Sequence, residues 1–320
     1  MSTINPDQAF VPPAPLETAV LFLIFNRPDV TLKVFETIRQ ARPPRLYVAA
    51  DGPRSDRLGE AEKCREARKI VDQVDWPCQV RTLFRSENLG CKRAVSGAIN
   101  WFFEHEEEGI ILEDDCLPAQ SFFWYCQELL EKYREDKRVW QICGLAFLEN
   151  KMRMNRKASY IFSKYGPIWG WASWRRAWIH YDAELVNWPV MREDQWLNSA
   201  YEDVSERRAR RKLGDAMFRK EIDTWDYQWG FTKNYQSGLS IVPTRNLIVN
   251  LGFGPDATHT KGSSHPLAPV SSGDVVFPME HPPYVITDTN HDQHYREELV
   301  VSSVSGFLKK AIRRVTRVFQ

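Results

Sequence analysis

The sequence lacks the glycine-rich motifs by which many α/β proteins bind nucleotides. No GxGxxG follows the first apolar stretch, and GxxxxGK[ST] is absent from the whole chain. These absences argue against a dinucleotide-binding dehydrogenase and against a P-loop protein. A nucleotide bound by this chain would need a cation and an arginine to hold its phosphates in place of a glycine-rich loop.

Charge of one sign, paired cysteines and long apolar stretches are also absent. The 43 Lys and Arg nearly balance the 42 Asp and Glu, so we expect no nucleic-acid partner. The six cysteines form no CxxC pair, which predicts reduced thiols in a cytoplasmic protein. No apolar run approaches the ~20 residues of a membrane-spanning helix, and residues 1–15 lack the basic and apolar pattern of a signal peptide.

Short apolar runs alternate with helical patterns in the first half of the chain. The predicted strands lie at 19–25, 46–50, 79–84 and 109–113, with helical spacing at about 30–41, 60–74 and 91–104. This alternation predicts an α/β fold with a mostly parallel, doubly wound sheet. Ligands of such sheets bind outside the carboxyl ends of the strands.

Three consecutive carboxylates, Glu113, Asp114 and Asp115, end the fourth apolar run. Adjacent carboxylates repel one another and resist burial unless a cation compensates them. Hard oxygen ligands of this kind suit a divalent metal ion. A solvated acidic turn before Pro118 is the alternative that these residues alone leave open.

Polar residues also follow the other predicted strands. Asn26 and Arg27 come after the first, Asp51 after the second and Asn88 after the third. Because the carboxyl ends of parallel strands share one edge of a sheet, we expect these side chains to lie beside the acidic triplet. Their convergence favours a ligand site with a metal ion over an acidic turn.

The second half is rich in tryptophan, which packs in protein cores and also lines sugar-binding clefts. Small residues separate large rings in 166–175, a pattern typical of a tight loop or of close approach to a ligand. Asp226 lies between Trp225 and Tyr227, a poorly solvated setting that suits a general base. The alternative for Asp226 is a helix cap.

The composition predicts five segments. They are a flexible arm at 1–18, a first half at 19–149 with the alternating strands and helices, a Trp-rich second half at 150–260, an irregular tail at 261–305 and a basic amphipathic helix at 306–320. The last segment has apolar residues on one face and Lys and Arg on the other, which indicates peripheral contact with an anionic membrane. Packing on the body or on a partner helix is the alternative. His259 can either complete a metal site or contact phosphate.

These motifs resemble those of GT-A fold nucleotide-sugar glycosyltransferases over about residues 19–260. The chain is similar to bacterial family 2-like transferases and to the N-acetylglucosaminyltransferase I type. The resemblance rests on a few short motifs: Asn26–Arg27–Pro28, Ala50–Asp51–Gly52, Glu113–Asp114–Asp115, Gly170–Trp171 and Trp225–Asp226. It implies a Rossmann-like sheet with helices on both faces, a nucleotide-sugar-binding half at 19–149 and a Trp-rich acceptor-binding half at 150–260.

The resemblance also implies a role for each site residue. Asp115 would ligate Mn²⁺ (or Mg²⁺) on the sugar-nucleotide diphosphate, Asp114 would lie by the ribose, and Asp51 would hydrogen-bond the uracil. Asp226 would be the catalytic base. Tyr227 departs from the second acid that relatives can show there, and Ser96 stands where an Asn is often found.

We therefore expect a metal-dependent, inverting transfer from a nucleoside-diphosphate sugar, a UDP-sugar first, to a glycan or lipid-linked acceptor in polysaccharide biosynthesis. The expected location is the cytoplasm, with peripheral contact at the cytoplasmic face of a membrane. Two alternatives are a sugar-1-phosphate nucleotidyltransferase and a noncatalytic carbohydrate-binding or scaffold protein.

Overall fold

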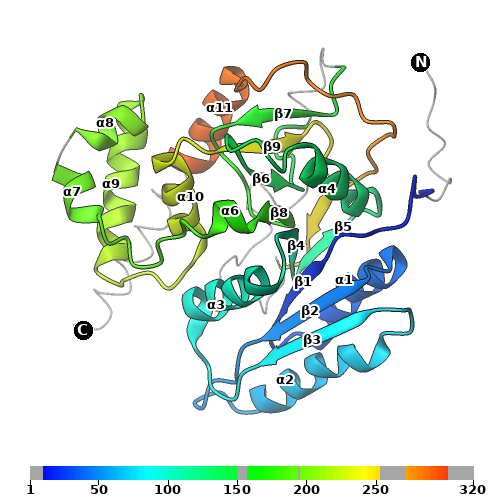
Figure 1. The fold of residues 1–320 in the computed structure, drawn as a ribbon. Helices are drawn as coiled ribbons and strands as arrows, with labels where there is room; N and C mark the ends of the chain where they lie inside the picture. The colour runs from blue at the N-terminus through cyan, green and yellow to red at the C-terminus, as the bar shows by residue number, and fades with distance from the viewer. Residues whose placement is uncertain (1–9, 150–156, 194, 253–270, 302–320) are drawn as a thin grey trace.

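The structure is a computed structural model that describes residues 10–149, 157–193, 195–252 and 271–301 (Figure 1). Its first half alternates strands and helices as the apolar runs predict. In chain order these are β1 (Val20–Ile24), α1 (Pro28–Ala41), β2 (Arg45–Ala50), α2 (Glu60–Arg68), the 3-10 helix η1 (Lys69–Gln73), β3 (Gln79–Phe84), α3 (Gly90–His105) and β4 (Glu108–Glu113).

The second half contains short strands and a group of helices. They are β5 (Cys116–Pro118), α4 (Ser121–Lys132), β6 (Val139–Cys143), β7 (Tyr160–Ser163), β8 (Trp171–Trp174), α6 (Arg175–Trp178), α7 (Trp188–Glu193), α8 (Trp196–Ala200), α9 (Val204–Phe218), α10 (Asp226–Tyr235), β9 (Leu239–Pro243), β10 (Ile248–Asn250), α11 (Thr289–Tyr295) and the π-helical turn η3 (Arg296–Val301).

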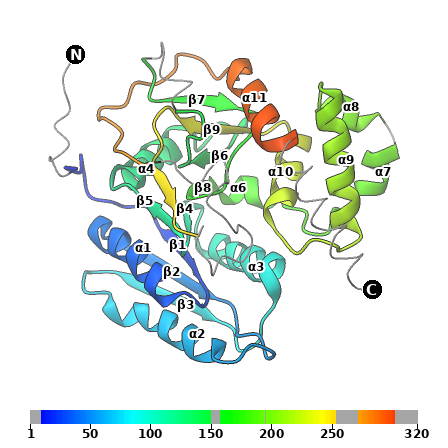
Figure 2. The same ribbon diagram turned by 180° about the vertical axis from the view of Figure 1, so that it is seen from behind.

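One sheet runs through both halves, in the order β3-β2-β1-β4-β8-β6-β9-β7. The first four strands are parallel, whereas β8 is antiparallel to both β4 and β6, and β7 is antiparallel to β9. A separate antiparallel pair joins β5 to β10. Helices cover both faces (Figures 1 and 2), so the predicted α/β fold, Rossmann-like and with a mostly parallel sheet, is confirmed.

Alternate residues of the strands enter two cores, one on each face of the sheet. Phe22 of β1 packs in the core that contains residues of α1 and α4, and Leu21 packs in the core that contains residues of α3. Side chains of a strand point alternately to its two faces, and helices cover both faces here, so apolar residues continue without interruption. This explains why the runs are apolar throughout.

Most of the tryptophans of the second half pack in the core, and Trp196, which is 55% exposed, is an exception. Trp171, Trp174, Trp225 and Trp229 are among the largest fully buried side chains or lie at 2% exposure or less. Trp171 stacks on Trp225 with ring centroids 5.6 Å apart. Trp225 therefore has no ring face free for a sugar, and of the two roles considered for the tryptophans it has that of core packing. Trp171 begins the central strand β8, so the predicted loop at 166–175 ends at Gly170.

Two terminal predictions also change. Residues 10–18 of the predicted flexible arm lie against α4, where Trp124 Nε1 donates a 2.6 Å hydrogen bond to the carbonyl of Ala14. The predicted irregular tail contains α11, whose N-terminus is capped by the Asp288 carboxylate. His259 and the predicted helix at 306–320 lie outside the described residues.

Two further predictions concern membrane-spanning helices and disulfide bonds. Among the described residues, no helix is both long enough and apolar enough to cross a membrane. All six cysteines are free thiols, as predicted from the absence of paired spacing.

Candidate functional site

The predicted site residues of the first half meet at the carboxyl edge of the sheet. Strands β1 and β4 pair with Leu23 opposite Glu113, and β1 pairs with β2 with Ile24 opposite Ala50. The residues that follow these strands therefore emerge at the same level of the sheet. Parallel pairing alone accounts for this convergence.

Arg27 joins the end of β1 to the acidic turn between β4 and β5. Its guanidinium forms an ion pair with Asp114 and another, of 3.0 Å, with Asp115. Burial opposes the charge of Arg27, but the two carboxylates outweigh burial and raise the pKa of Arg27 above its ordinary value. The arginine that was predicted to hold phosphates thus lies beside both acids. Its guanidinium has the forked set of N–H donors that binds phosphate.

Glu113 and Asp114 are held in a setting with little solvent. Burial raises the pKa of Asp114 to about 6, because the loss of hydration outweighs the attraction of Arg27. Burial, followed by the charges of Asp115, Asp114 and Asp226, raises the pKa of Glu113 to about 8. Glu113 Oε1 has no hydrogen-bond partner among the described residues. With all three acids ionised, the triplet would carry more negative charge than Arg27 alone compensates, and this repulsion adds to burial in raising the pKa of Glu113.

Asp51 holds the loop that begins α3. Its carboxylate accepts hydrogen bonds from the backbone N–H groups of Gly52, Leu89 and Gly90 and from Asn88 Nδ2, at 2.9–3.2 Å. Burial raises the pKa of Asp51, although the backbone donors oppose that shift. Asp51 and Asn88 are brought together as predicted, and Asp51 has a structural role in addition to the predicted contact with a base.

Asn26 points toward the start of α2. Its Nδ2 donates a 2.8 Å hydrogen bond to Glu60, a buried carboxylate that is also paired with Arg54. The hydrogen bond from Arg54 and then burial are the largest influences on Glu60, and the net effect lowers its pKa. Asn26 is therefore placed at the edge of the site by a contact within the protein.

Asp226, from the second half of the chain, lies near enough to the acidic triplet for its charge to raise the pKa of Glu113. It is the first residue of α10, and Thr224 Oγ1 donates a hydrogen bond to its Oδ1. Because α10 begins at Asp226, the N-cap position belongs to Trp225, and Asp226 occupies the first helical position instead of the predicted cap position. Its charge raises the pKa of Glu113 and of the half-buried Cys91, for which burial is the larger cause. The predicted base and the predicted metal-binding acids thus belong to one site.

Asp223 is a site residue that the sequence did not indicate. Its carboxylate accepts hydrogen bonds from the backbone N–H groups of Cys91 (2.9 Å) and Lys92 (3.1 Å) at the start of α3. Gly90 has φ +79° and no side chain, and a Cβ there would lie against Asp223 Oδ2. This contact spans 132 residues of sequence, so no local pattern could have shown it. It fixes the loop before Asp226 to the start of α3.

Asn250 and Gly252 lie beside Asp115, and neither was predicted to do so. Strand β10 pairs with β5 so that Asn250 is opposite Cys116, and the backbone N–H of Leu251 donates a 2.7 Å hydrogen bond to Asp115 O. A Cβ at Gly252 would collide with Asp115 Oδ2 and lie 2.9 Å from Asn250 Oδ1. Two hard oxygens therefore border the space that the glycine leaves open.

These oxygens fit a metal ion that is shared with a substrate. Among the described residues, no three His, Cys, Asp or Glu side chains converge to hold a metal ion by themselves. Magnesium and similar ions commonly use one or two protein carboxylates and take their remaining ligands from phosphate and water. Asp115, with Asn250 beside it, has the donor chemistry for that kind of site.

A buried lysine lies at the other end of α10, beneath the loop that contains Gly166. Lys233 is 2% exposed, and its ammonium hydrogen-bonds Ser240 Oγ and, at 3.4 Å, Gln141 Oε1. Gln141 Nε2 in turn donates a 2.8 Å hydrogen bond to the carbonyl of Pro167. Burial lowers the pKa of Lys233 to about 8.

We expect this lysine to make stability depend on pH in the alkaline range. The unfolded chain keeps the proton up to its ordinary pKa of about 10.4, whereas folding favours the neutral amine above about pH 8. The unfolding free energy of the wild type relative to that of Lys233→Met should therefore rise by roughly 3 kcal/mol between about pH 8 and about pH 10.4. Below about pH 8 the folded protein carries the full free-energy cost of burying the charged ammonium.

Urea unfolding at several pH values measures this difference. Lys220→Met is the matched control, because the Lys220 side chain is 74% exposed, and its difference from wild type should not change with pH. Parallel stability curves for wild type and Lys233→Met would contradict the assignment of the low pKa to Lys233.

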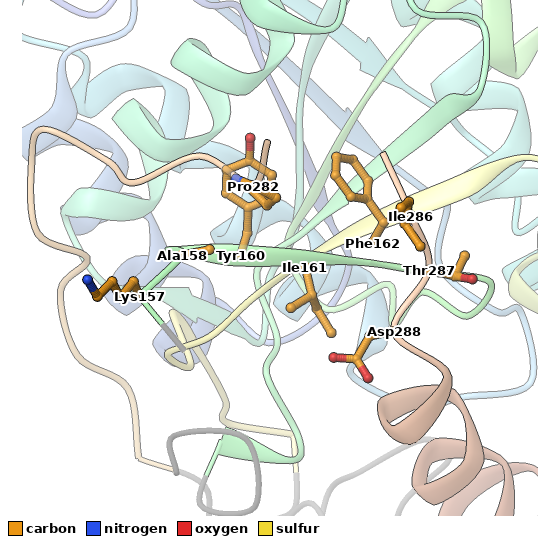
Figure 3. Close-up of a pocket in the computed structure, with 9 residues that line it drawn as sticks. All are labelled: Lys157, Ala158, Tyr160, Ile161, Phe162, Pro282, Ile286, Thr287 and Asp288. Carbon is orange, nitrogen blue, oxygen red and sulfur yellow. The ribbon is translucent and has the colours of Figure 1, made fainter. Parts of the chain in front are cut away.

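A cavity of about 280 Å³ lies along β7, the edge strand at the far end of the sheet from β3 (Figure 3). Its lining residues are Lys157, Ala158, Tyr160, Ile161, Phe162, Pro282, Ile286, Thr287 and Asp288. None of the predicted site residues that the structure describes lines it. We place the candidate site at the carboxyl edge of the sheet because the charged groups converge there.

Comparisons with known proteins return distant similarities of structure. No family model matches the chain, and no curated protein matches it. HddC from Yersinia pseudotuberculosis is 9% identical, covering 50% of this chain and 77% of that chain, with a TM-score of 0.30. The structure of its complex with GMP-PN is 10% identical over the same shares of both chains, with a TM-score of 0.29. An active-site mutant of LgtC is 9% identical, covering 75% of this chain and 91% of that chain, with a TM-score of 0.35. Scores this low carry no functional argument.

Proposed function

We propose that this protein is a glycosyltransferase that moves a sugar from a nucleoside-diphosphate sugar, a UDP-sugar first, to a hydroxyl of a glycan or lipid-linked acceptor. The observation that supports this proposal is the position of Asp226. Its charge acts on an acidic triplet whose three carboxylates outnumber Arg27, the cation that is paired with two of them. A base near acids that can hold a divalent cation is an arrangement suited to metal-assisted transfer from a diphosphate.

The donor half would hold the nucleotide and its phosphates. Arg27 would bind the diphosphate, Asp114 would lie by the ribose, and the Asp51–Asn88 loop would contact the base. Asp115, with Asn250, would hold a divalent cation, Mn²⁺ or Mg²⁺, which when bound neutralises the charge that develops on the leaving diphosphate. These roles follow the resemblance, and the ion pairs of Arg27 support them.

Asp226 would act on the acceptor. Its carboxylate takes the proton of the acceptor hydroxyl as that oxygen forms a bond to the anomeric carbon of the sugar. The bond from the anomeric carbon to the diphosphate oxygen breaks on the opposite side, so the configuration inverts. Asp223 keeps the loop before Asp226 on the start of α3, which places the base relative to the donor.

The proposal is tested by incubating the full chain with Mn²⁺ and separate UDP-, GDP- and dTDP-sugars. Release of a nucleoside diphosphate, faster with an acceptor glycan present, is the expected result. Release of pyrophosphate from a nucleoside triphosphate and a sugar 1-phosphate would instead identify a nucleotidyltransferase. If the protein neither turns over nor binds any donor, the proposal is overturned and only the noncatalytic alternative is left.

A further inference from the structure

Helix α9 presents a cationic face to solvent. Arg208, Arg211 and Lys212 are exposed, and the helical period places them on the same face as Val204 and Phe218. Val204 is 49% exposed and Phe218 is 43% exposed. The face therefore has an apolar residue toward each end and cations between them.

These cations have no partners in the described part of the chain. No carboxylate there forms an ion pair with Arg208, Arg211 or Lys212, whereas Asp215, the acid on this face, is paired with Arg192 at 2.7 Å. The neighbouring Arg210 is buried against Glu206 and takes no part in the face. An uncompensated cationic face next to exposed apolar side chains is the pattern of a surface that meets anionic lipid headgroups.

The position of α9 in the molecule favours a partner with a broad surface, such as a membrane. Helices α7, α8 and α9 form a group on the side of the molecule away from α2 and β3 (Figures 1 and 2). The turn η3 packs against α9, and the chain continues from Val301 at that place. Residues 302–320 contain five Lys or Arg and no Asp or Glu, so the sequence that follows adds further positive charge.

We propose that the exposed face of α9 is a membrane-contacting surface that binds anionic phospholipid headgroups. The three cations attract the phosphate-bearing surface, and Val204 and Phe218 enter the boundary between headgroups and acyl chains. The folded body thus contributes to membrane contact independently of residues 306–320. This inference rests on α9 alone and does not require the proposed glycosyltransferase activity.

The test measures sedimentation of the full chain with vesicles of phosphatidylcholine, with and without phosphatidylglycerol. Wild type should bind the anionic vesicles and be released by salt. The variant R208Q/R211Q/K212Q should partition roughly 100-fold less. The control K63Q/R65Q/K69Q removes the same charge from exposed positions of α2 and of the start of η1 and should bind as wild type does.

A second pair of variants separates α9 from the tail. In a full-length chain with the five tail cations at 309, 310, 313, 314 and 317 changed to Gln, the α9 substitutions should still lower the remaining binding. The proposal is overturned if the α9 variant binds like wild type in both backgrounds, or if the α2 control loses as much binding. Binding of single-stranded RNA without binding of vesicles would also overturn it.

Discussion

Replacing Asp226 with asparagine is expected to lower kcat for sugar transfer by about 10³-fold, with the KM for the donor changed by less than about threefold. An amide cannot take the acceptor proton, and general base catalysis contributes on the order of 10²–10⁴ in rate. Asparagine keeps an oxygen that can accept the hydrogen bond from Thr224 Oγ1. The fold and the donor site should therefore persist, and the loss should fall on the chemical step.

The matched control for this substitution is Asp203→Asn. Asp203 is also an acid at the start of a helix, and it caps α9 by accepting a 2.8 Å hydrogen bond from Glu206 N. It should lower stability by no more than about 1 kcal/mol and leave kcat unchanged. Steady-state kinetics with saturating donor and acceptor measures the effect. A kcat for Asp226→Asn within tenfold of wild type would exclude Asp226 as the base.

Replacing Asp115 with asparagine is expected to abolish activation by Mn²⁺ and to lower kcat by about 10²–10³-fold, the cost of removing one preorganised group that stabilises developing charge. The substitution removes the carboxylate that is paired with Arg27 and lies beside Asn250. Arg27 keeps its ion pair with Asp114, so binding of the nucleotide should weaken less than binding of the metal.

Metal binding gives this prediction a readout other than turnover. Titration of Mn²⁺ in the presence of a nucleoside diphosphate, followed by electron paramagnetic resonance, should show a bound ion with wild type and much weaker binding with Asp115→Asn. Asp29→Asn, an exposed acid in the first turn of α1, should behave as wild type does. Equal Mn²⁺ binding by both variants would show that Asp115 is not a ligand.

The donor edge could be predicted because its residues follow strands with a continuous apolar pattern. Arg27, Asp51 and Asp115 each come within three residues of the end of such a run, and parallel pairing then requires that they share an edge. Strands β1, β2 and β4 are buried on both faces, as their apolar runs predict, whereas β3 lies at the edge of the sheet and is partly exposed. This part of the site is a local property of the sequence together with one rule of topology.

The remaining contacts depend on pairings that no local pattern contains. Strand β8 enters the sheet between β4 and β6 although its sequence resembles a tight loop, because its two large rings fill both cores: Trp171 packs in the core that contains residues of α3 and α10, and Trp174 in the core that contains residues of α4. Asp223 and Asn250 reach the site only through contacts across more than a hundred residues of sequence. The same packing buried Trp225 and removed it from the predicted sugar-binding surface.

The position of β8 has a consequence for engineering the protein. A donor half transplanted onto a different acceptor half would lose the strand that hydrogen-bonds β4, and α3 would lose the carboxylate of Asp223 at its start. Specificity for a new acceptor is therefore better sought by exchanging surface segments around α10 than by recombining the chain at residue 150. The two halves are interleaved, and a crossover between them divides a single sheet.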